Sequence, residues 1–535
     1  MKGREEGQRS HFRKPGAGSR HELAPLRGSR KRLSKRVIFP DNQRNRGLHL
    51  VAASGSGKSL ALGYLAYLDL LRGTPQIILD PMGQAVDALL LRVSQLPRSE
   101  RRLLWPRIRY IDMSGRTDRP PRWPLLFELP DDPLAAAGER FVETCLAIDS
   151  QLEEAPLLGA NALRRLGQPV GMILTALGRQ LDDAPSLLDR PEGWLPRLEE
   201  ARRAHPEAGG AVDLFISDYM GMKPAERLTI SQSYRSKLMP IVLDPTLRSI
   251  LCSGPPSVDF YDVVDRRGCV LVDFRGARPG AKQLLTRWVY DCLLAFVKNR
   301  GPGLHRPLAV HIDEIIDLAD QGSLGADRLA RDLDLLLNIL MRNCNLWVTA
   351  AHQQMWQVGE RSRETLLSMG TQMIGQVSDL ETAEILARRF AGQIDPKRIK
   401  RMRNVWMSSS PYGIPYVIEE EPVDFPLEEQ TFDAARAFLR LAPFEFFIKP
   451  RTTSRVSRAT LAGEMGPPWP NENAELLAYI RYQLALREGP IRYPMCQEEI
   501  SARVAEPHVK IGEAEHHEER DIEEYIEDWR AQPPP

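Results

Sequence analysis

The sequence has few of the features that mark secreted, zinc-binding or membrane-embedded proteins. Only six of its 535 residues are cysteine, and none shows Cys-x-x-Cys or Cys/His ligand spacing, which argues against a zinc site or a disulfide framework and favours a reducing compartment. No apolar run approaches the ~20 residues that a membrane span needs. The basic N-terminus lacks the apolar segment of a signal peptide. We therefore expect a cytoplasmic protein that reaches the inner face of a membrane, if at all, only through partners.

Net charge also says little, because 72 Lys and Arg nearly balance 71 Asp and Glu. The distribution of charge is more informative. Residues 1–36 contain twelve Lys or Arg against three Glu, and the last 25 residues are dominated by Glu and Asp. This asymmetry suggests a basic arm that faces nucleic acid and an acidic interaction tail. Two solvated, disordered ends explain it equally well.

The most informative segment is Ala52–Ser59, with the sequence AASGSGKS. A predicted buried strand precedes it at 47–51, and a predicted helix follows at 60–68. A strand, a glycine-rich loop, Lys-Ser and a helix form the pattern of a phosphate-binding P-loop, here with alanine in place of the first glycine. We expect ATP and Mg²⁺ as ligands. The predicted nucleotide-binding residues are Ala52, Ser54, Gly55, Ser56, Gly57, Lys58, Ser59 and Leu60.

Two of these side chains have predicted chemical roles. Lys58 would reach the β- and γ-phosphates of the nucleotide, and the Ser59 hydroxyl would ligate Mg²⁺. The backbone N–H groups of the loop and the N-terminus of the following helix would bind phosphate oxygens.

Strand and helix patterns alternate along much of the chain, which predicts an α/β fold with a mainly parallel sheet. Between about 133 and 245 the pattern is helical with few strands, which indicates an all-α domain inserted into the α/β domain. The predicted strands are 76–80, 108–112, 268–274, 308–312, 346–350 and 372–376, and the predicted helices are 134–148, 160–181, 194–204, 231–242, 282–298, 326–341 and 381–390. The last strand and helix are expected to close the core.

Five segments are therefore predicted. Residues 1–36 form a basic, disordered tail, and residues 37–124 form the first part of the ATPase domain with the P-loop. Residues 125–245 form the all-α domain, and residues 246–450 form the second part of the ATPase domain. Residues 451–535 form a helical and acidic tail, whose part beyond Pro467 we expect to lie outside the motor core.

Asp313 and Glu314 directly follow the predicted apolar strand 308–312. In many P-loop ATPases the first carboxylate at such a strand end helps to hold Mg²⁺, and the second orients or activates the attacking water. Acidic residues that begin a helix are the alternative explanation. Because the P-loop is predicted in the same sheet, we expect Asp313 as a metal ligand and Glu314 as the hydrolytic carboxylate.

Three further residues lie near predicted strand ends. Gln353 follows the strand 346–350, where a polar side chain can reach the γ-phosphate, although a solvent-facing glutamine is the alternative. Arg342 precedes that strand and could supply a charge to a neighbouring subunit's γ-phosphate, although its spacing alone favours a helix C-terminal arginine. Asp80 ends the strand 76–80, and we expect it to cap the following turn close to the nucleotide.

A basic cluster follows the last predicted helix. It could contact DNA phosphates, but a solvated helix face is the default interpretation. The cluster consists of Lys397, Arg398, Lys400, Arg401 and Arg403.

The ordered motifs resemble those of type IV secretion coupling proteins of the TraG and TraD kind, within the HerA/FtsK superfamily of DNA-pumping ATPases. The resemblance covers roughly residues 37–449. It rests on the segment leading into the P-loop, LDPMG at 79–83, WPLL at 123–126 in place of the usual Asn-Pro-Leu, DPTLRSIL at 244–251, VLVD at 270–273, and the segment from Met341 to Gln353.

The resemblance implies a RecA-like motor, a hexameric ring with a central DNA channel, and a helical domain at one mouth. It also implies that Arg342 acts between subunits and that Gln353 senses the nucleotide. Partners would be DNA, further copies of this chain, and a relaxase or secretion-channel proteins. The chain departs from the pattern by lacking the N-terminal membrane helices of membrane-bound coupling proteins and the β-barrel of HerA proteins.

Three functional hypotheses remain open at this point. The first is a DNA translocase driven by ATP hydrolysis, with a HerA-like DNA-processing ATPase as a variant. The second is an ATPase that remodels or secretes protein without stimulation by DNA. The third is a non-catalytic nucleotide switch, which the presence of Lys58, Ser59, Asp313 and Glu314 disfavours.

Overall fold

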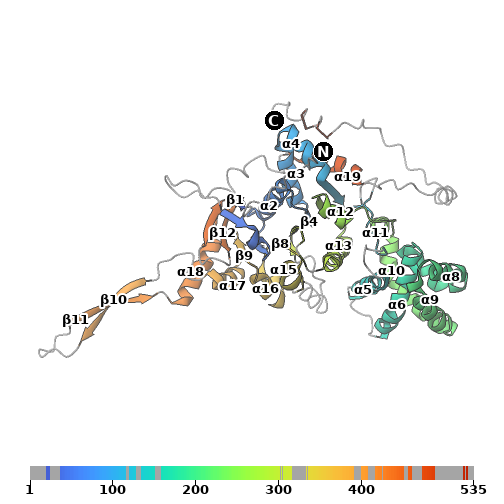
Figure 1. Ribbon diagram of the computed structural model, residues 1–535. Helices are drawn as coiled ribbons and strands as arrows, with labels where there is room; N and C mark the ends of the chain where they lie inside the picture. The colour runs from blue at the N-terminus through green and yellow to red at the C-terminus, as the bar shows by residue number, and fades with distance from the viewer. Residues whose placement is uncertain are drawn as a thin grey trace, which may run out of the picture.

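The computed structural model shows an α/β core with a helical lobe on one side and a long hairpin on the other (Figure 1). No helix among the described residues is long and apolar enough to cross a membrane. The structure describes residues 20–23, 37–115, 120–127, 134–150, 158–301, 303, 305–315, 333, 335–358, 360–390, 399–407, 416–424, 426–450, 456–460, 473–488, 522–523 and 526–527.

The core is one nine-stranded sheet in the order β13-β12-β9-β3-β8-β7-β4-β6-β5. Every neighbouring pair from β9 to β5 is parallel, whereas β12 and β13 are antiparallel additions at one edge. The predicted α/β class with a mainly parallel sheet is confirmed. The strands are β3 (Leu48–Val51), β4 (Gln76–Asp80), β5 (Ile108–Asp112), β6 (Cys269–Asp273), β7 (Leu308–Ile312), β8 (Leu346–His352), β9 (Thr371–Ile374), β12 (Glu445–Pro450) and β13 (Ser457–Thr460).

Helices cover both faces of the sheet, so its central strands are buried throughout. Alternate residues of β4 enter different hydrophobic clusters, because successive side chains of a strand point to opposite faces. Ile77 and Leu79 lie in the cluster that contains Val289 and Leu293 of α13 (Pro279–Arg300). Ile78 lies in the cluster that contains residues of α2 (Lys58–Arg72) and α3 (Gln84–Gln95).

A lobe of helices stands beside the sheet (Figure 1). The chain enters and leaves this lobe along neighbouring paths, because Trp123 N–H donates to Ile250 O at 2.9 Å and Leu125 N–H donates to Leu251 O at 3.0 Å. The lobe comprises α5 (Leu134–Ser150), α6 (Leu158–Ala176), α7 (Ala184–Asp189), α8 (Leu195–Ala204), α9 (Gly209–Leu214), α10 (Pro224–Leu243) and α11 (Pro245–Leu251).

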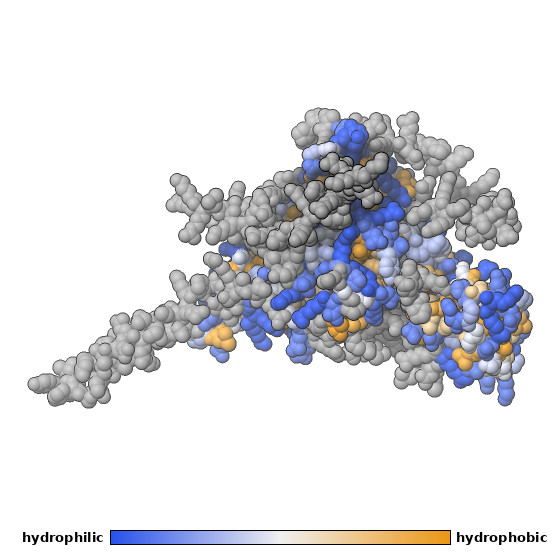
Figure 2. Space-filling view, in the orientation of Figure 1, coloured by the Kyte–Doolittle hydropathy of each residue, from blue (hydrophilic) through white to orange (hydrophobic). Residues whose placement is uncertain are grey.

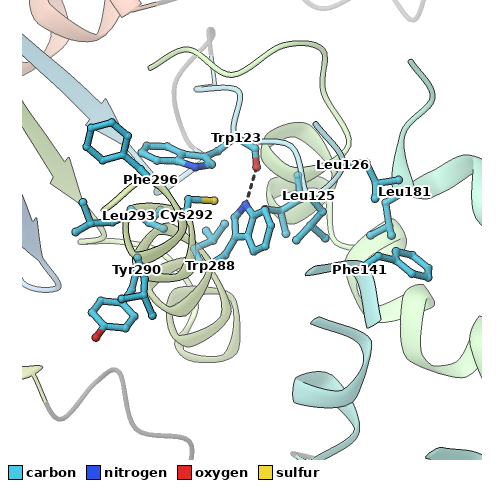
Figure 3. Packing of buried hydrophobic residues seen from close by; sticks show 14 of the residues in the cluster. Trp123, Leu125, Leu126, Phe141, Leu181, Trp288, Tyr290, Cys292, Leu293 and Phe296 are labelled. Carbon is cyan, nitrogen blue, oxygen red and sulfur yellow. Dashed lines mark hydrogen bonds between the residues drawn. The ribbon is translucent and has the colours of Figure 1, made fainter. Parts of the chain in front are cut away.

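The lobe and the sheet share one hydrophobic core (Figure 3). Trp288 of α13 donates its indole N–H to Trp123 O at 3.2 Å, which holds the entering chain against the sheet. In Figure 3, Leu125 and Leu126 lie between this tryptophan pair and Phe141 of the lobe. Buried side chains thus continue without a break from the lobe to the strands that carry the candidate site, and the lobe packs against those strands.

The remaining elements are shorter or lie at the edges. They are β1 (Arg20–Leu23), β2 (Val37–Pro40), α1 (Asp41–Arg44), α4 (Arg98–Leu104), η1 (Trp105–Arg107), η2 (Leu181–Asp183), η3 (Pro191–Trp194), η4 (Pro206–Ala208), η5 (Phe215–Met220), α12 (Phe260–Asp265), η7 (Leu335–Leu340), α15 (Met341–Asn343), η8 (Met355–Gln357), α16 (Glu360–Leu367), α17 (Leu380–Phe390), β10 (Ile399–Met407), β11 (Tyr416–Asp424), α18 (Leu427–Leu439) and α19 (Ala474–Glu488).

Two expectations about where the core ends are wrong. The strand at 371–374 and α17 do not close the core, because β12 pairs with β9 and β13 pairs with β12. The tail beyond Pro467 does not lie wholly outside the core either. Buried residues of α19 such as Ile480 join the cluster of α2 and α3, and Arg481 pairs with Asp87 of α3 at 2.5 Å.

Other local expectations also differ from the structure. Arg20–Leu23 was expected to be disordered but forms β1, whose backbone groups pair with those of β2. The basic cluster was expected on a helix face, yet Lys400, Arg401 and Arg403 lie on β10, which forms an antiparallel hairpin with β11. Lys397 and Arg398 lie outside the described residues. So does half of the predicted helix 326–341, of which η7 and the start of α15 form the described end.

Candidate nucleotide site

The P-loop lies at the carboxyl end of the parallel strands, between the ends of β8 and β9. β3 pairs with both strands, and beyond it Ala52 N–H donates to His352 O at 3.3 Å and Ala53 N–H to Gln376 O at 2.7 Å. The loop then turns into α2 through two left-handed glycines, Gly55 (φ 77°) and Gly57 (φ 95°). Such φ values favour glycine, which explains both positions.

Gly57 is required for a second reason. A Cβ atom there would lie 2.4 Å from the ring of Phe444, at the turn that enters β12. Phe444 also donates its backbone N–H to Ser56 O at 2.9 Å. The antiparallel edge of the sheet therefore packs directly against the P-loop. Phe444 itself has φ 65°, which is rare for a bulky residue and is typical of functional or tightly constrained positions.

Asp313 and Glu314 lie beside the loop, at the end of β7. Asp313 is almost fully buried, and its backbone N–H donates to Leu79 O at 3.0 Å. Ser59 donates its hydroxyl to Asp313 Oδ2 at 2.7 Å. Lys58 forms ion pairs with Asp313 and, at 2.6 Å, with Glu314 Oε1. The structure thus brings together the residues to which the sequence assigned phosphate binding, metal binding and hydrolysis.

The surroundings keep Lys58 charged. Burial acts to lower the pKa of this ammonium, but the charges of Asp313 and Glu314 outweigh it, so the pKa of Lys58 lies above its usual value. A permanently charged lysine at this position can exchange its carboxylate partners for phosphate oxygens.

The donor set fits Mg²⁺. Ser59 and Asp313 offer a hydroxyl and a carboxylate, which are hard oxygen ligands of the kind that Mg²⁺ prefers. Within the described part of the chain no three or more His, Cys, Asp or Glu side chains cluster as a metal cage. A site with one or two protein ligands suits Mg²⁺, which usually completes its shell with water and phosphate oxygens.

Gln353 completes the group from the end of β8. Its side-chain N–H donates to Glu314 Oε1 at 2.7 Å, the same oxygen that faces Lys58. Glu314 has φ 51°, an uncommon backbone conformation for glutamate. Glu314 is therefore held by two donors, Lys58 at the start of α2 and Gln353 after β8, and it is partly open to solvent.

Asp80 caps the turn after β4, as expected. Its carboxylate accepts from four backbone N–H groups, at 2.7–3.1 Å, those of Met82, Gly83, Ala85 and Val86. Burial, followed by the neighbouring charges of Asp313 and Asp273, raises the pKa of Asp80 to about 7. A cation bound at Asp313 would favour the ionised form of Asp80, because it would offset the neighbouring negative charges that raise this pKa.

Arg342 is exposed and lies on α15, before the start of β8. Gln353 follows the other end of that strand, and the rise of β8 separates the two ends by roughly 20 Å. The structure therefore does not bring Arg342 to the carboxylates of its own chain.

A buried histidine pair connects the strands around the P-loop. Gln372 of β9 donates its amide to the backbone carbonyls of Leu366, Leu367 and Met369, so its Oε1 is left to accept from His49 Nδ1 at 2.7 Å. His49 Nε2 also lies 2.7 Å from His352 Nε2, and His352 Nδ1 lies 3.2 Å from the carbonyl oxygen of Gln354. The pair connects β3, which leads into the P-loop, to β8, which leads into Gln353.

These histidines should make the fold sensitive to acid. Burial lowers the pKa of His49 from 6.5 to about 4, only partly offset by Gln372, and also lowers the pKa of His352. The unfolded chain then binds more protons than the folded chain between pH 4 and 6.5, so stability falls as pH decreases through this window. We expect His49 alone to lower the free energy of unfolding by about 2 kcal/mol when the pH falls from 7 to 5.

Urea unfolding of the native chain and of His49→Gln at pH 7 and pH 5 checks this expectation. The difference in the free energy of unfolding between pH 7 and pH 5 should be about 2 kcal/mol smaller in the variant than in the native chain. His305→Gln, at a partly exposed histidine outside the pair, serves as the control and should keep the full dependence. Equal pH dependence in the native chain and His49→Gln would show that His49 is not held neutral.

Sequence reasoning missed both Phe444 and the histidine pair. His49 and His352 lie 303 residues apart in the chain, so no local pattern pairs them. No local pattern predicts that a residue before β12 contacts the P-loop.

The parallel sheet, the P-loop and the acidic end of β7 define an α/β P-loop fold. No protein-family model matches the sequence, and no curated protein matches it. Solved structures that match include the bacterial conjugative coupling protein TrwBdeltaN70 in its unbound form (16% identity, 81% of this chain and 89% of that chain, TM-score 0.46). TrwB in complex with ADP and Mg²⁺ also matches (16% identity, 83% and 95%, TM-score 0.46).

VirB4 of Thermoanaerobacter pseudethanolicus matches as well (14% identity, 82% of this chain and 95% of that chain, TM-score 0.45).

Proposed function

We propose that this chain is an ATP-hydrolysing motor of the type IV secretion coupling kind, which acts on DNA as an oligomeric ring. One observation carries the ATPase part: Lys58, Ser59 and Gln353 all contact the carboxylates of Asp313 and Glu314. A phosphate-binding loop placed against two carboxylates suits hydrolysis, which depends on positioning and charge stabilisation.

Each residue has a proposed role. The backbone of residues 52–60 and Lys58 bind the phosphates of ATP, and Ser59 and Asp313 hold Mg²⁺. When bound, Mg²⁺ neutralises charge on the β- and γ-phosphates. Glu314 orients the attacking water, and Gln353 senses the nucleotide through its bond to Glu314.

The proposed cargo is DNA, and this part rests on the motif resemblance described above. The experiment that tests it measures ATP turnover in a titration with DNA over a series of salt concentrations. We expect DNA to raise turnover severalfold and the stimulation to weaken as salt rises, because contacts to phosphates release counterions. Turnover that is unaffected by DNA at every salt concentration would instead favour an ATPase that remodels protein.

In the proposed ring, Arg342 has a role that can be tested. Because Arg342 is exposed and remote from the site of its own chain, we propose that it reaches the γ-phosphate in a neighbouring subunit. Arg342→Ala should lower turnover by about 100-fold or more while ATP binding persists, since such arginines act on the transition state. The exposed Arg266→Ala variant is the matched control and should behave as the native chain.

Mixing two inactive variants separates an effect in trans from one in cis. Arg342→Ala subunits retain an intact P-loop, and Lys58→Ala subunits retain Arg342. Mixed assemblies should regain part of the turnover, because some interfaces then combine an intact site with an intact arginine. If no mixture recovers activity, Arg342 does not act across an interface.

A further inference from the structure

The far C-terminal end of the chain contacts the core at α4 and η1. Its described residues, Ile522, Glu523, Ile526 and Glu527, are helical and lie beside α4 near the top of Figure 1. We call these four residues the C-terminal segment. In Figure 2 the described surface around α4 is mostly hydrophilic.

One carboxylate forms the centre of this contact. Glu523 accepts from Arg101 Nη2 at 2.7 Å and from Arg101 Nε at 3.2 Å, and its Oε1 also accepts from the indole N–H of Trp105 at 3.0 Å. Arg101 is fully buried, and Glu523 is 4% exposed. A forked arginine contact of this kind recognises a carboxylate by its shape as well as by its charge.

The core orients Arg101 for this contact. Arg101 Nη1 donates to the backbone carbonyl of Leu96 at 2.8 Å and more weakly to that of Ser94, while Nε and Nη2 face Glu523. Donors fixed by α4 and the preceding turn are thus already aimed at an incoming carboxylate. We call Arg101, Leu104 and Trp105 the Arg101 socket.

An apolar stripe adds to the charged contact. Ile522 and Ile526, four residues apart on one helix face, are buried in the same cluster as Leu104 and Trp105. Glu523 and Glu527 have the same spacing, and Glu527 contacts Arg98 at 3.2 Å where both side chains are half exposed. Such an exposed pair contributes little, so Glu523 and the two isoleucines account for the recognition.

We propose that the Arg101 socket is a docking site for an acidic amphipathic helix, and that the C-terminal segment is its displaceable intramolecular occupant. Residues 489–521 separate this segment from α19, and 33 residues can span up to roughly 110 Å. Because the contact is small, we expect the segment to bind weakly when it is supplied as a free peptide. The same segment linked to the chain acts at an effective concentration of about millimolar, so it can still occupy the socket. A partner helix with the pattern Ile-Glu-x-x-Ile-Glu would compete for the same socket.

This proposal does not depend on the ATPase function and is tested by peptide binding. A fluorescent peptide of residues 518–530 is titrated into the native chain and into a full-length variant with Glu523→Lys and Ile526→Asp, which should vacate the socket. We expect binding to the vacated variant to be about tenfold tighter or more, because the chain's own segment no longer competes. Equal binding to both proteins, or no binding to either, would overturn the proposal.

Two controls address specificity and folding. A peptide with Glu523→Gln should bind about tenfold more weakly to the vacated variant, and Arg101→Lys in that variant should weaken the unmodified peptide similarly, since a point charge replaces the fork. A native melting temperature confirms that Arg101→Lys folds. If neither change weakens binding, the carboxylate contact does not define the site.

Hydrogen exchange of the full native chain shows whether the socket holds the C-terminal segment of the same chain or that of a second copy. Protection of the amides at 522–527 should not depend on protein concentration if the contact is intramolecular. Protection that is lost on dilution would place the segment of a second copy in the socket and overturn the intramolecular part of the proposal.

Discussion

Glu314→Gln is expected to lower ATP turnover by about 100-fold or more while leaving nucleotide binding nearly intact. The glutamine keeps the size of the side chain and still accepts from Gln353, which contacts Glu314 Oε1 at 2.7 Å. It removes the negative charge that would orient and activate the attacking water, and positioned acid–base groups typically contribute 10²–10⁴-fold. Phosphate release and equilibrium ATP binding, measured on the same preparation, separate the two effects.

The matched control is Glu200→Gln, an exposed carboxylate in the helical lobe. It makes the same chemical change away from the site and should leave turnover unaltered. If Glu314→Gln retained more than about a third of native turnover, Glu314 would not act on the water, because that loss is far below the range for such groups.

Lys58→Ala should abolish measurable turnover, weaken ATP binding and also destabilise the protein without nucleotide. Removal of this cation leaves Asp313 and Glu314 facing each other without their shared ion-pair partner. Breaking a buried pair by removing one member costs about 3–5 kcal/mol.

Urea unfolding at pH 8 measures the change, and Lys223→Ala, at an exposed lysine, serves as the control. A control that unfolds as the native chain does, together with a loss of stability in Lys58→Ala, supports the observed ion pairs. Native stability of Lys58→Ala at pH 8 would show that Lys58 does not hold the two carboxylates in the protein without nucleotide.

The parts of the fold that the sequence predicts are those with local signals. The P-loop combines a strand, two glycines and a helix start within a few residues, and β7 ends directly in Asp313 and Glu314. Parallel strands place their carboxyl ends at one edge of the sheet, so the meeting of these two segments follows from the alternating pattern. The same reasoning predicts that Gln353 lies near Glu314, but it does not predict the hydrogen bond between the two side chains.

The parts that could not be predicted depend on contacts between distant segments. β12 joins the sheet by antiparallel pairing with β9, and its own residues carry no signal that selects this edge. Arg481 of α19 pairs with Asp87, 394 residues earlier, and Glu523 pairs with Arg101. Acidic composition predicts an exposed tail, and tertiary packing overrides that prediction where a buried arginine and an apolar cluster are available.

The most direct test of the central claim is single-turnover hydrolysis of bound ATP with Mg²⁺ in the native chain and in Glu314→Gln. We expect the native chain to convert bound ATP to ADP and phosphate, and Glu314→Gln to hold ATP unhydrolysed over the same period. Hydrolysis at equal rates in both proteins, or bound ATP that the native chain never hydrolyses, would contradict the assignment of this site as an ATPase centre.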